Sequence, residues 1–302
     1  MTFVSGPVTV RVPASSANLG PGFDTLGLAL SLYDEITAEV TEDSENDGEQ
    51  GLAFSIEGEG SDNIPRDRTH LVVSSMNRAF DVLGESPRGL RMHFRNVIPH
   101  GRGLGSSAAA IVGGLVAARA LVEGGEAKLD DDALLALANE IEGHPDNVAA
   151  ALLGGLTIAW TALGIGKAVR LDVLADVSVF IPPVSVSTHT ARGVLPAKVS
   201  HADAAANAGR AALLVAALVG GRADVLFAAT EDRLHQDYRA PEMPESHEFM
   251  SSLRADGIPA IISGAGPAVL AFASGSDLSA HTPAGWAYRE LGVDSEGATL
   301  IS

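Results

Sequence analysis

The 302-residue chain contains no cysteine, which excludes disulfides, thiolate metal sites and thiol nucleophiles. A hydrophobic fraction of 46% predicts a globular protein of one large or two modest domains and excludes disorder over most of the length. With a formal net charge of −18, neither nucleic acid nor an anionic membrane is an expected partner, because an acidic surface repels phosphate groups.

The acidity has two explanations. Lysine is confined to Lys128, Lys167 and Lys198, and aromatic residues make up only 5% of the chain. This composition favours adaptation to molar salt, as in a halophilic archaeon, because a Debye length of roughly 3 Å screens self-repulsion. An ordinary acidic protein is the alternative. Residues 1–13 lack the features of a signal peptide, and we find no apolar run long enough to span a bilayer, so we expect a cytoplasmic protein.

In the first half of the chain, alternating apolar and polar residues predict strands near 8–13, 35–40, 52–57 and 90–97. The acidic segment 41–51 is expected to be a hairpin loop. Helical periodicity predicts helices over 69–84 with Thr69 as N-cap, over 106–122 and over 130–142, and then a short helix and a strand within 147–160.

Beyond residue 164 the pattern restarts. It predicts strands at 177–181 and 259–263 and helices at 203–219, 223–234 and 247–256. The alternation of strands and helices indicates an α+β protein with two domains, residues 1–163 and 164–302.

The segment VIPHGRGLGSSAAAIVGG, residues 97–114, places glycines and serines between a strand and an alanine-rich helix. It matches neither the dinucleotide fingerprint nor the phosphate loop that ends in lysine. Gly101, Gly103 and Gly105 can adopt positive φ and turn N–H groups toward anionic oxygens, and the helix N-terminus adds positive charge. The following serines offer hydroxyls to a phosphate or a magnesium ion. We therefore predict an oligophosphate site; a plain helix N-cap is the alternative.

Three motifs resemble those of the GHMP kinases, in the same order: VRVPASSANLGPGFDTLGLAL, PHGRGLGSSAAA and ISGAGPAVLAF. The first of them, together with IEGHPDNVAAALLGG and DRLHQDYR, is similar to the members that act on homoserine rather than to the sugar kinases. The resemblance implies a two-domain GHMP kinase fold, with an N-terminal domain like domain 2 of ribosomal protein S5 and a ferredoxin-like C-terminal domain. It also implies ATP-dependent phosphorylation of L-homoserine in threonine biosynthesis.

ATP and Mg²⁺ are the cofactors that the resemblance implies. The residues that it assigns to the nucleotide are Pro99, His100, Gly101, Arg102, Gly103, Leu104, Gly105, Ser106, Ser107, Ala108 and Ala109. For magnesium it implies a serine at the helix start and a glutamate late in the following helix. These are Ser106 and Glu142, with Ser107 and Glu140 as alternatives. Two weaker expectations place Asn63 near the adenine and Arg95 near the phosphates.

A zwitterionic amino acid needs cations for its carboxylate and an anion for its ammonium group. By resemblance, Arg192 and Arg239 bind the carboxylate and Asp24 pairs with the ammonium group. The further substrate-binding positions are Asn18, His144 and Thr188.

The catalytic positions are Asp146 and Asn147. Either the aspartate acts as a general base, or the asparagine orients the hydroxyl in a transfer that needs no base. Two other functions stay open: another small-molecule GHMP kinase, of the mevalonate or pantoate type, and a non-catalytic ligand sensor. The macromolecular partner that we consider is a second copy of the chain, in a homodimer.

Overall fold

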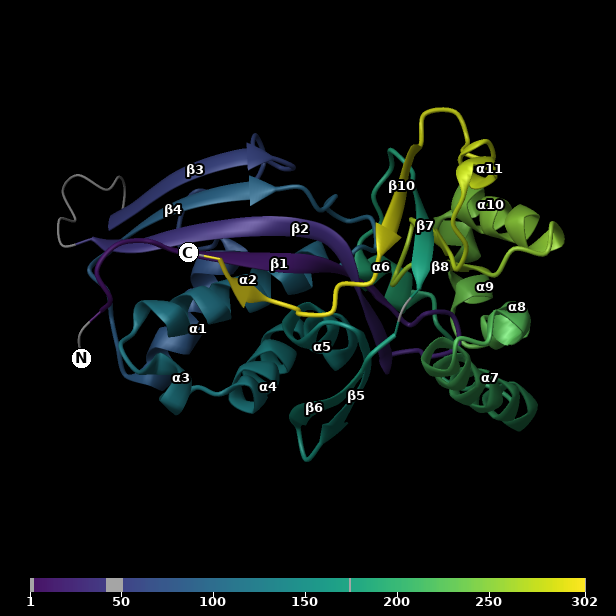
Figure 1. Ribbon diagram of the computed structural model, residues 1–302, viewed down its shortest axis with the longest axis horizontal. Coiled ribbons are helices and arrows are strands. Elements are labelled where there is room, and N and C mark those ends of the chain that lie inside the picture. The colour runs from purple at the N-terminus through teal and green to yellow at the C-terminus, as the bar shows by residue number, and fades with distance from the viewer. Residues whose placement is uncertain (1–2, 42–50, 174, 302) are drawn as a thin grey trace.

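The structure is a computed structural model that describes residues 3–41, 51–173 and 175–301; the predicted hairpin loop lies almost wholly outside these residues. Two sheets lie side by side along the long axis of the molecule, with the N-terminal one at the left of Figure 1 and the C-terminal one at the right. Strands and helices are mixed in both, as the α+β prediction requires.

The larger sheet has seven strands within the described residues: β1 (Val8–Ala17), β2 (Leu26–Thr41), β3 (Leu52–Gly58), β4 (Gly89–Asn96), β5 (Leu156–Ala162), β6 (Ile165–Leu171) and β11 (Thr299–Leu300). Their order is β11-β1-β2-β4-β3, and β5 joins at the start of β2. Strands β3 and β4 are parallel, and the other described pairs are antiparallel.

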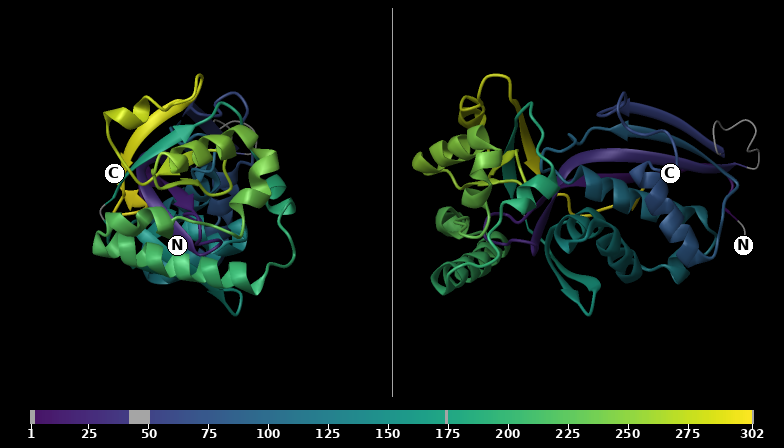
Figure 2. Two further views of the ribbon diagram at one scale, coloured as in Figure 1. Left: turned by 90° about the vertical axis from the view of Figure 1, so that its right-hand side faces the viewer. Right: turned by 180° about the vertical axis from the view of Figure 1, so that it is seen from behind.

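Helices cover one face of this sheet (Figure 1; Figure 2, right). They are α1 (Leu71–Leu83), α2 (Ser106–Leu121), α3 (Gly125–Lys128), α4 (Asp131–Glu142) and α5 (Pro145–Leu153). The predicted start of α4 is confirmed, because Asp130 accepts the N–H of Ala133. The predicted cap of α1 is wrong: His70 Nδ1 accepts the N–H of Val72, whereas Thr69 bonds to Asp67.

The smaller sheet is antiparallel and consists of β7 (Asp176–Ile181), β8 (Ala260–Ile262), β9 (Val269–Ala271) and β10 (Ala287–Gly292). Its order, β10-β7-β9-β8, is the 4-1-3-2 order of a ferredoxin-like sheet. The two longer helices, α7 (His201–Gly220) and α10 (Pro244–Ala255), lie in front of it in Figure 2, left. The short helices are α6 (Thr188–Gly193), η2 (Ala223–Val225), α8 (Leu226–Ala229), α9 (Gln236–Arg239), η3 (Ala240–Glu242) and α11 (Ser276–Ser279).

The predicted domain boundary between residues 163 and 164 is wrong, because it falls inside the β5–β6 hairpin. Strand β6 pairs with β5 along its length and so belongs to the larger sheet. The chain enters the smaller sheet only at β7, and after β10 it returns so that β11 pairs with β1. A tight hairpin and a new domain both begin with a glycine turn and a strand, so the local pattern cannot distinguish them.

Among the described residues, helix α7 alone is long and apolar enough to cross a membrane. The expectation that the chain has no apolar run of that length is therefore corrected. Side chains of α7 contact other segments of the same chain. Asn207 donates to the carbonyl of Pro21, and Arg210 pairs with Glu231. Leu214 and Leu218 are buried in the core.

Candidate active site

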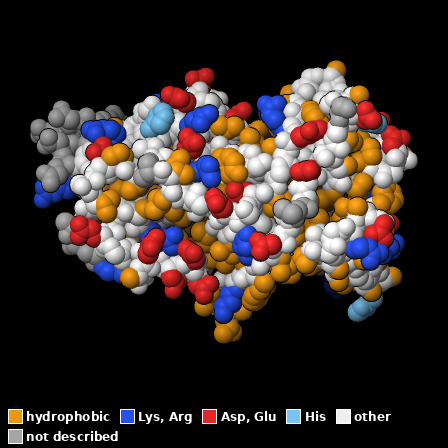
Figure 3. Space-filling view, in the orientation of Figure 1, with side chains coloured by type: hydrophobic (Ala, Val, Ile, Leu, Met, Phe, Trp, Pro, Cys, Tyr) orange, Lys and Arg blue, Asp and Glu red, His pale blue; other side chains and the backbone are white. Residues whose placement is uncertain are grey.

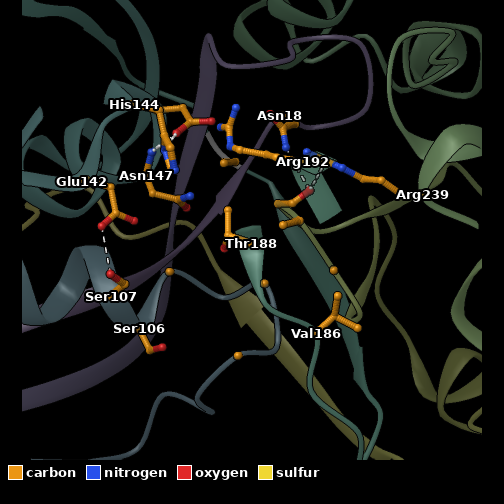
Figure 4. Close-up of a pocket in the computed structure, with 18 residues that line it drawn as sticks. Asn18, Ser106, Ser107, Glu142, His144, Asn147, Val186, Thr188, Arg192 and Arg239 are labelled. Carbon is orange, nitrogen blue, oxygen red and sulfur yellow. Dashed lines mark hydrogen bonds and ion pairs between the residues drawn. The ribbon is translucent and has the colours of Figure 1, made fainter. Parts of the chain in front are cut away.

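A cavity opens where the two sheets meet, and residues from both halves of the chain line it (Figure 4). Asn18 and Gly264 illustrate the junction: 246 positions apart, they are joined by a 2.9 Å hydrogen bond from Asn18 Nδ2 to the glycine carbonyl. The lining residues are Ala17, Asn18, Gly101, Gly103, Gly105, Ser106, Ser107, Glu142, His144, Asp146, Asn147, Val186, Thr188, Arg192, Arg239, Gly264, Ala265 and Gly266.

The glycine-rich loop forms one wall. Gly101, Gly103 and Gly105 have φ of 65°, 75° and 71°, the left-handed region that glycine adopts without strain. Gly105 is the N-cap of α2 and has no side chain that could cap the first turn. The N-terminus of α2 therefore presents free N–H donors and the positive end of its dipole to the cavity, which suits an anion.

Five of the eleven residues assigned to the nucleotide line this cavity: Gly101, Gly103, Gly105, Ser106 and Ser107. The other six do not. Leu104, Ala108 and Ala109 are core residues, and Pro99 and His100 line neighbouring cavities. The guanidinium of Arg102 donates to the carbonyls of His100, Pro182 and Pro183, so this cation holds the two halves together and is not offered to a phosphate.

Opposite the loop lies the turn after β8, which the third motif forms. Ser263 Oγ donates to the carbonyl of Gly103 over 2.7 Å, and the N–H of Ala268 donates to the carbonyl of Arg102. A Cβ on Gly103 would overlap the carbonyl oxygen of Ser263. The two glycine-rich turns therefore touch through their backbones, and Gly264 and Gly266 complete the wall.

The candidate magnesium ligands are Glu142 and a serine at the start of α2. Ser107 Oγ donates to Glu142 Oε2 over 2.9 Å, whereas no contact joins Ser106 to Glu142 in the described part of the chain. The alternative Glu140 pairs with Arg78 on the surface and does not line the cavity. Burial raises the pKa of Glu142, against the opposing effect of the Ser107 hydroxyl. A partly buried carboxylate with one hydroxyl partner, beside an anion site, suits a hard cation that takes its other ligands from phosphate and water.

A triad of polar side chains at the start of α5 faces the same cavity. Asp146 Oδ1 lies 2.9 Å from His144 Nδ1 and accepts the N–H of Asn147 over 2.8 Å. Burial lowers the pKa of His144, but the hydrogen bond and charge of Asp146 outweigh burial, and the net effect is a raised pKa. The Asp146 side chain is only 2% exposed, and it holds the other two residues in place.

Arg192 and Asp24, both assigned to the substrate, bind each other. The two guanidinium nitrogens Nη1 and Nη2 of Arg192 donate to the two carboxylate oxygens of Asp24 over 2.9 and 2.6 Å. Asp24 does not line the cavity, whereas Arg192 does, and its Nε is buried without a hydrogen-bond partner in the described residues. The aspartate therefore orients the arginine, and an unused donor remains on the arginine. Thr188, at the start of α6, lines the same side.

The second arginine, Arg239, is almost fully buried. Its Nε donates to the carbonyl of Ala191, and its Nη1 contacts His235 Nδ1 and the carbonyl of Gly264. Burial, together with the charge of Arg192, lowers the pKa of Arg239 to about 10. The ring of Phe23 lies under both guanidinium groups, at 5.6 and 5.5 Å. Two like charges so close together favour an anionic ligand between them.

A second, mostly apolar cavity adjoins the start of α2 and shares Ser106 and Ser107 with the first. Its wall includes Ile64, Pro65 and His70, which the sequence analysis did not single out. Burial lowers the pKa of His70 to about 4, so its ring is neutral. Because Nδ1 accepts the N–H of Val72, Nε2 carries the proton, and this buried donor has no partner in the described residues.

The sequence also suggested Asn63 and Arg95. Arg95 pairs with Glu35 on the surface and lines neither cavity. Asn63 lines a shallow hollow that shares Asn96 with the apolar cavity, and the next residue, Ile64, lines that cavity. Asn63 therefore lies beside the apolar cavity without lining it.

Residues 70–155 match the family described as GHMP kinases N terminal domain. A homoserine kinase of Streptomyces coelicolor is 56% identical over 99% of this chain and 96% of its own length, and one of Leifsonia xyli is 48% identical over 97% and 91%. The crystal structure of homoserine kinase from Cytophaga hutchinsonii aligns over both full chains with a TM-score of 0.82 and 26% identity. These bacterial relatives do not support an archaeal source.

Proposed function

The chain belongs to the homoserine kinase family within the GHMP kinases, and from this premise we propose that it phosphorylates L-homoserine with ATP in threonine biosynthesis. The bond from the γ-phosphorus to the homoserine hydroxyl oxygen forms while the bond to the bridging oxygen of ATP breaks, so that O-phospho-L-homoserine and ADP leave. One observation carries the proposal: the N-terminus of α2 and the guanidinium groups of Arg192 and Arg239 face one cavity. Transfer between a polyphosphate and an amino-acid alcohol needs both kinds of site at reacting distance.

ATP is proposed to lie across the two cavities. The triphosphate meets the backbone N–H groups of the glycine-rich loop, and the adenine enters the apolar cavity that begins at Ser106 and Ser107. The free Nε2–H of His70 is the donor that we assign to a ring nitrogen of the base. A neutral ring among apolar side chains suits a flat, uncharged base.

Glu142 and the Ser107 hydroxyl are proposed to hold Mg²⁺, with Ser106 as the alternative hydroxyl. The ion would neutralise charge on the phosphates. Glu142 lies on the loop side of the cavity, which supports the assignment over Glu140.

We expect Glu142→Gln to weaken the apparent affinity for Mg²⁺ by at least about tenfold, because losing even an outer partner of a metal ligand costs about 10- to 100-fold. The same change should raise the Tm of the ligand-free enzyme. Burial raises the pKa of Glu142 in the folded state, so its deprotonated form destabilises the fold. The Tm of the variant therefore exceeds that of the wild type by an amount that grows as pH rises above 4.5, the ordinary pKa of this carboxyl group.

Rates measured against Mg²⁺ concentration and thermal unfolding at pH 4.5 and pH 7 test both expectations. Glu140→Gln is the matched control, since its carboxylate pairs with Arg78 in solvent. An unchanged Mg²⁺ dependence in the Glu142 variant, or an equal change in the control, would contradict the assignment.

For homoserine, we propose that Arg192 and Arg239 bind the carboxylate in their shared positive field. Asn18, Thr188 and His144 contact the rest of the amino acid. Asp24 is proposed as the negative charge that balances the ammonium group. It does not line the cavity and its oxygens accept two bonds from Arg192, so it acts on the ammonium group through its charge and not through a direct hydrogen bond.

Asn147 is proposed to hold the attacking hydroxyl, and Asp146 to hold Asn147 and His144. Asp146 Oδ1 already accepts two hydrogen bonds and the side chain is almost wholly buried, which favours the transfer without a base over proton abstraction by Asp146. A loose transition state needs little activation of the nucleophile, so the hydroxyl proton can pass late to an oxygen of the transferred group.

An ADP-release assay with homoserine, mevalonate, pantoate and galactose tests the function. We expect homoserine to be preferred by at least about 100-fold, since a site built for an ammonium group rejects acceptors that lack it. Preference for mevalonate or pantoate, retained by Asp24→Asn, would indicate another GHMP kinase. No ADP release with any acceptor would favour a ligand sensor.

The same assay at low and high potassium chloride separates the two explanations of the charge. An enzyme adapted to molar salt loses its fold at low salt, and an ordinary acidic protein is indifferent. We place the reaction in the cytoplasm, where ATP is available.

A homodimer is also proposed. The β5–β6 hairpin exposes Trp160, Leu163, Ile165 and Val169, and apolar side chains gather at its tip, at the lower edge of Figure 3. Sedimentation of the purified protein tests this assembly.

A further inference from the structure

Ser15, in β1, is a buried side chain that touches the proposed catalytic machinery without lining its cavity. Its Oγ donates to Asn147 Oδ1 over 2.9 Å. Its N–H donates to the carbonyl of Leu104 over 3.1 Å, within the glycine-rich loop. A Cβ on Gly105 would overlap the Ser15 hydroxyl, so the N-cap of α2 rests directly on this serine. One side chain therefore links the asparagine to the phosphate-binding wall.

The hydrogen bond decides which way the Asn147 amide faces. A primary amide has an oxygen that accepts and a nitrogen that only donates. With the amide oxygen facing Ser15 the hydroxyl proton is paired, whereas a reversed amide would present Nδ2, which cannot accept that proton, and would break the hydrogen bond that the structure shows. The amide nitrogen of Asn147 is consequently the atom left for the cavity.

We propose that Ser15 is a positioning residue for phosphoryl transfer: it fixes the Asn147 amide so that Nδ2 donates to the oxygen of the attacking hydroxyl. The inference rests on the proposed function, in which Asn147 holds that hydroxyl. A donated hydrogen bond places the oxygen but cannot remove its proton, which agrees with transfer that needs no base. Because Ser15 also contacts Leu104 and Gly105, the acceptor oxygen and the phosphate-binding loop share one rigid support.

A double-mutant cycle tests the inference with Ser15→Ala, Asn147→Ala and the combined variant. We expect Ser15→Ala to lower kcat by about tenfold, the effect of one hydrogen bond, with KM for ATP nearly unchanged. In the Asn147→Ala background the same change should alter kcat by less than about twofold, because the amide that it orients is gone. A serine that merely supports the fold would lower kcat equally in both backgrounds, and that result would overturn the inference.

Ser75→Ala is the matched control. Ser75 is another fully buried serine with a single hydrogen bond, to the carbonyl of Leu71 within α1, and we expect its loss to leave kcat unchanged. Thermal unfolding checks that each variant folds; if Ser15→Ala does not, Ser15→Cys carries the same comparison, because a thiol is a weak donor. Full activity of Asn147→Ala would overturn the proposed role of Asn147 itself. A severe loss there with no coupling to Ser15 would overturn only the role of Ser15.

Discussion

Replacing Gly103 by alanine is expected to lower kcat/KM by more than about 100-fold. Its φ of 75° is itself unfavourable for alanine, by about 1–2 kcal/mol. In addition, the new Cβ would overlap the carbonyl oxygen of Ser263 and lie 2.9 Å from both N and O of Gly266. These are all backbone atoms, so one of the two glycine-rich turns must move. A displacement of about 1 Å in an active site can cost about 100-fold in rate.

Gly84→Ala separates the collision from the backbone strain. Gly84 follows α1 with φ of 72°, and a Cβ there would meet no atom within 4 Å. We expect Gly84→Ala to lower Tm slightly and to leave kcat/KM unchanged, whereas Gly103→Ala lowers both Tm and kcat/KM. Equal Tm and kcat/KM for the two variants would show that the turns do not need their close contact.

Replacing Arg192 by alanine should raise KM for homoserine by roughly 100- to 1000-fold and leave KM for ATP nearly unchanged. The guanidinium is proposed to bind the substrate carboxylate, and hydrogen bonds between charged groups contribute about 1.5–3 kcal/mol each. The variant also leaves the Asp24 carboxylate unpaired beside the cavity, which repels the substrate carboxylate. Initial rates with each substrate varied in turn measure the two constants.

Arg222→Ala is the control for this variant. Arg222 also makes a bidentate contact with an aspartate, through Nε and Nη2 to Asp224, but on the surface, with both side chains more than half exposed. Its loss should leave Tm and both KM values nearly unchanged, because exposed ion pairs contribute little to stability. An Arg192 variant that keeps its KM for homoserine would place the substrate carboxylate elsewhere.

Most elements of the fold were predictable because each reflects a local pattern. Alternation identified β1, β3, β4 and β7, and helical periodicity identified α2 and α4 within a residue or two. The predicted helix over 223–234 was wrong, because η2 and α8 end by Ala229 and the carboxylate of Asp232 then accepts N–H groups at the start of α9. Strands β6, β9, β10 and β11 were missed. Strands β6, β10 and β11 are largely exposed, so their alternation is weak, and β9 is three buried residues, too few to show a period.

The sequence could predict the site residues that lie within recognisable motifs, but not the contacts between segments that are far apart in the chain. The spacing of the glycines before α2 predicted an anion site, and the polar cluster from His144 to Asn147 was identified through the resemblance to GHMP kinases that act on homoserine. The sequence does not distinguish Ser106 from Ser107, since that choice depends on which hydroxyl faces α4. His70 and Ser15 carried no signal at all: one resembles any helix cap and the other any buried strand serine.

The sequence by itself determined where the backbone could bend and which helix could bind an anion, because those properties belong to neighbouring residues. Only the tertiary structure decided that Asp24 meets Arg192, 168 positions away, and that Ser15 meets Asn147, 132 positions away. Burial decided the rest: it set the pKa values of Glu142, His70 and Arg239, and burial exists only once segments that are far apart in the sequence have packed together.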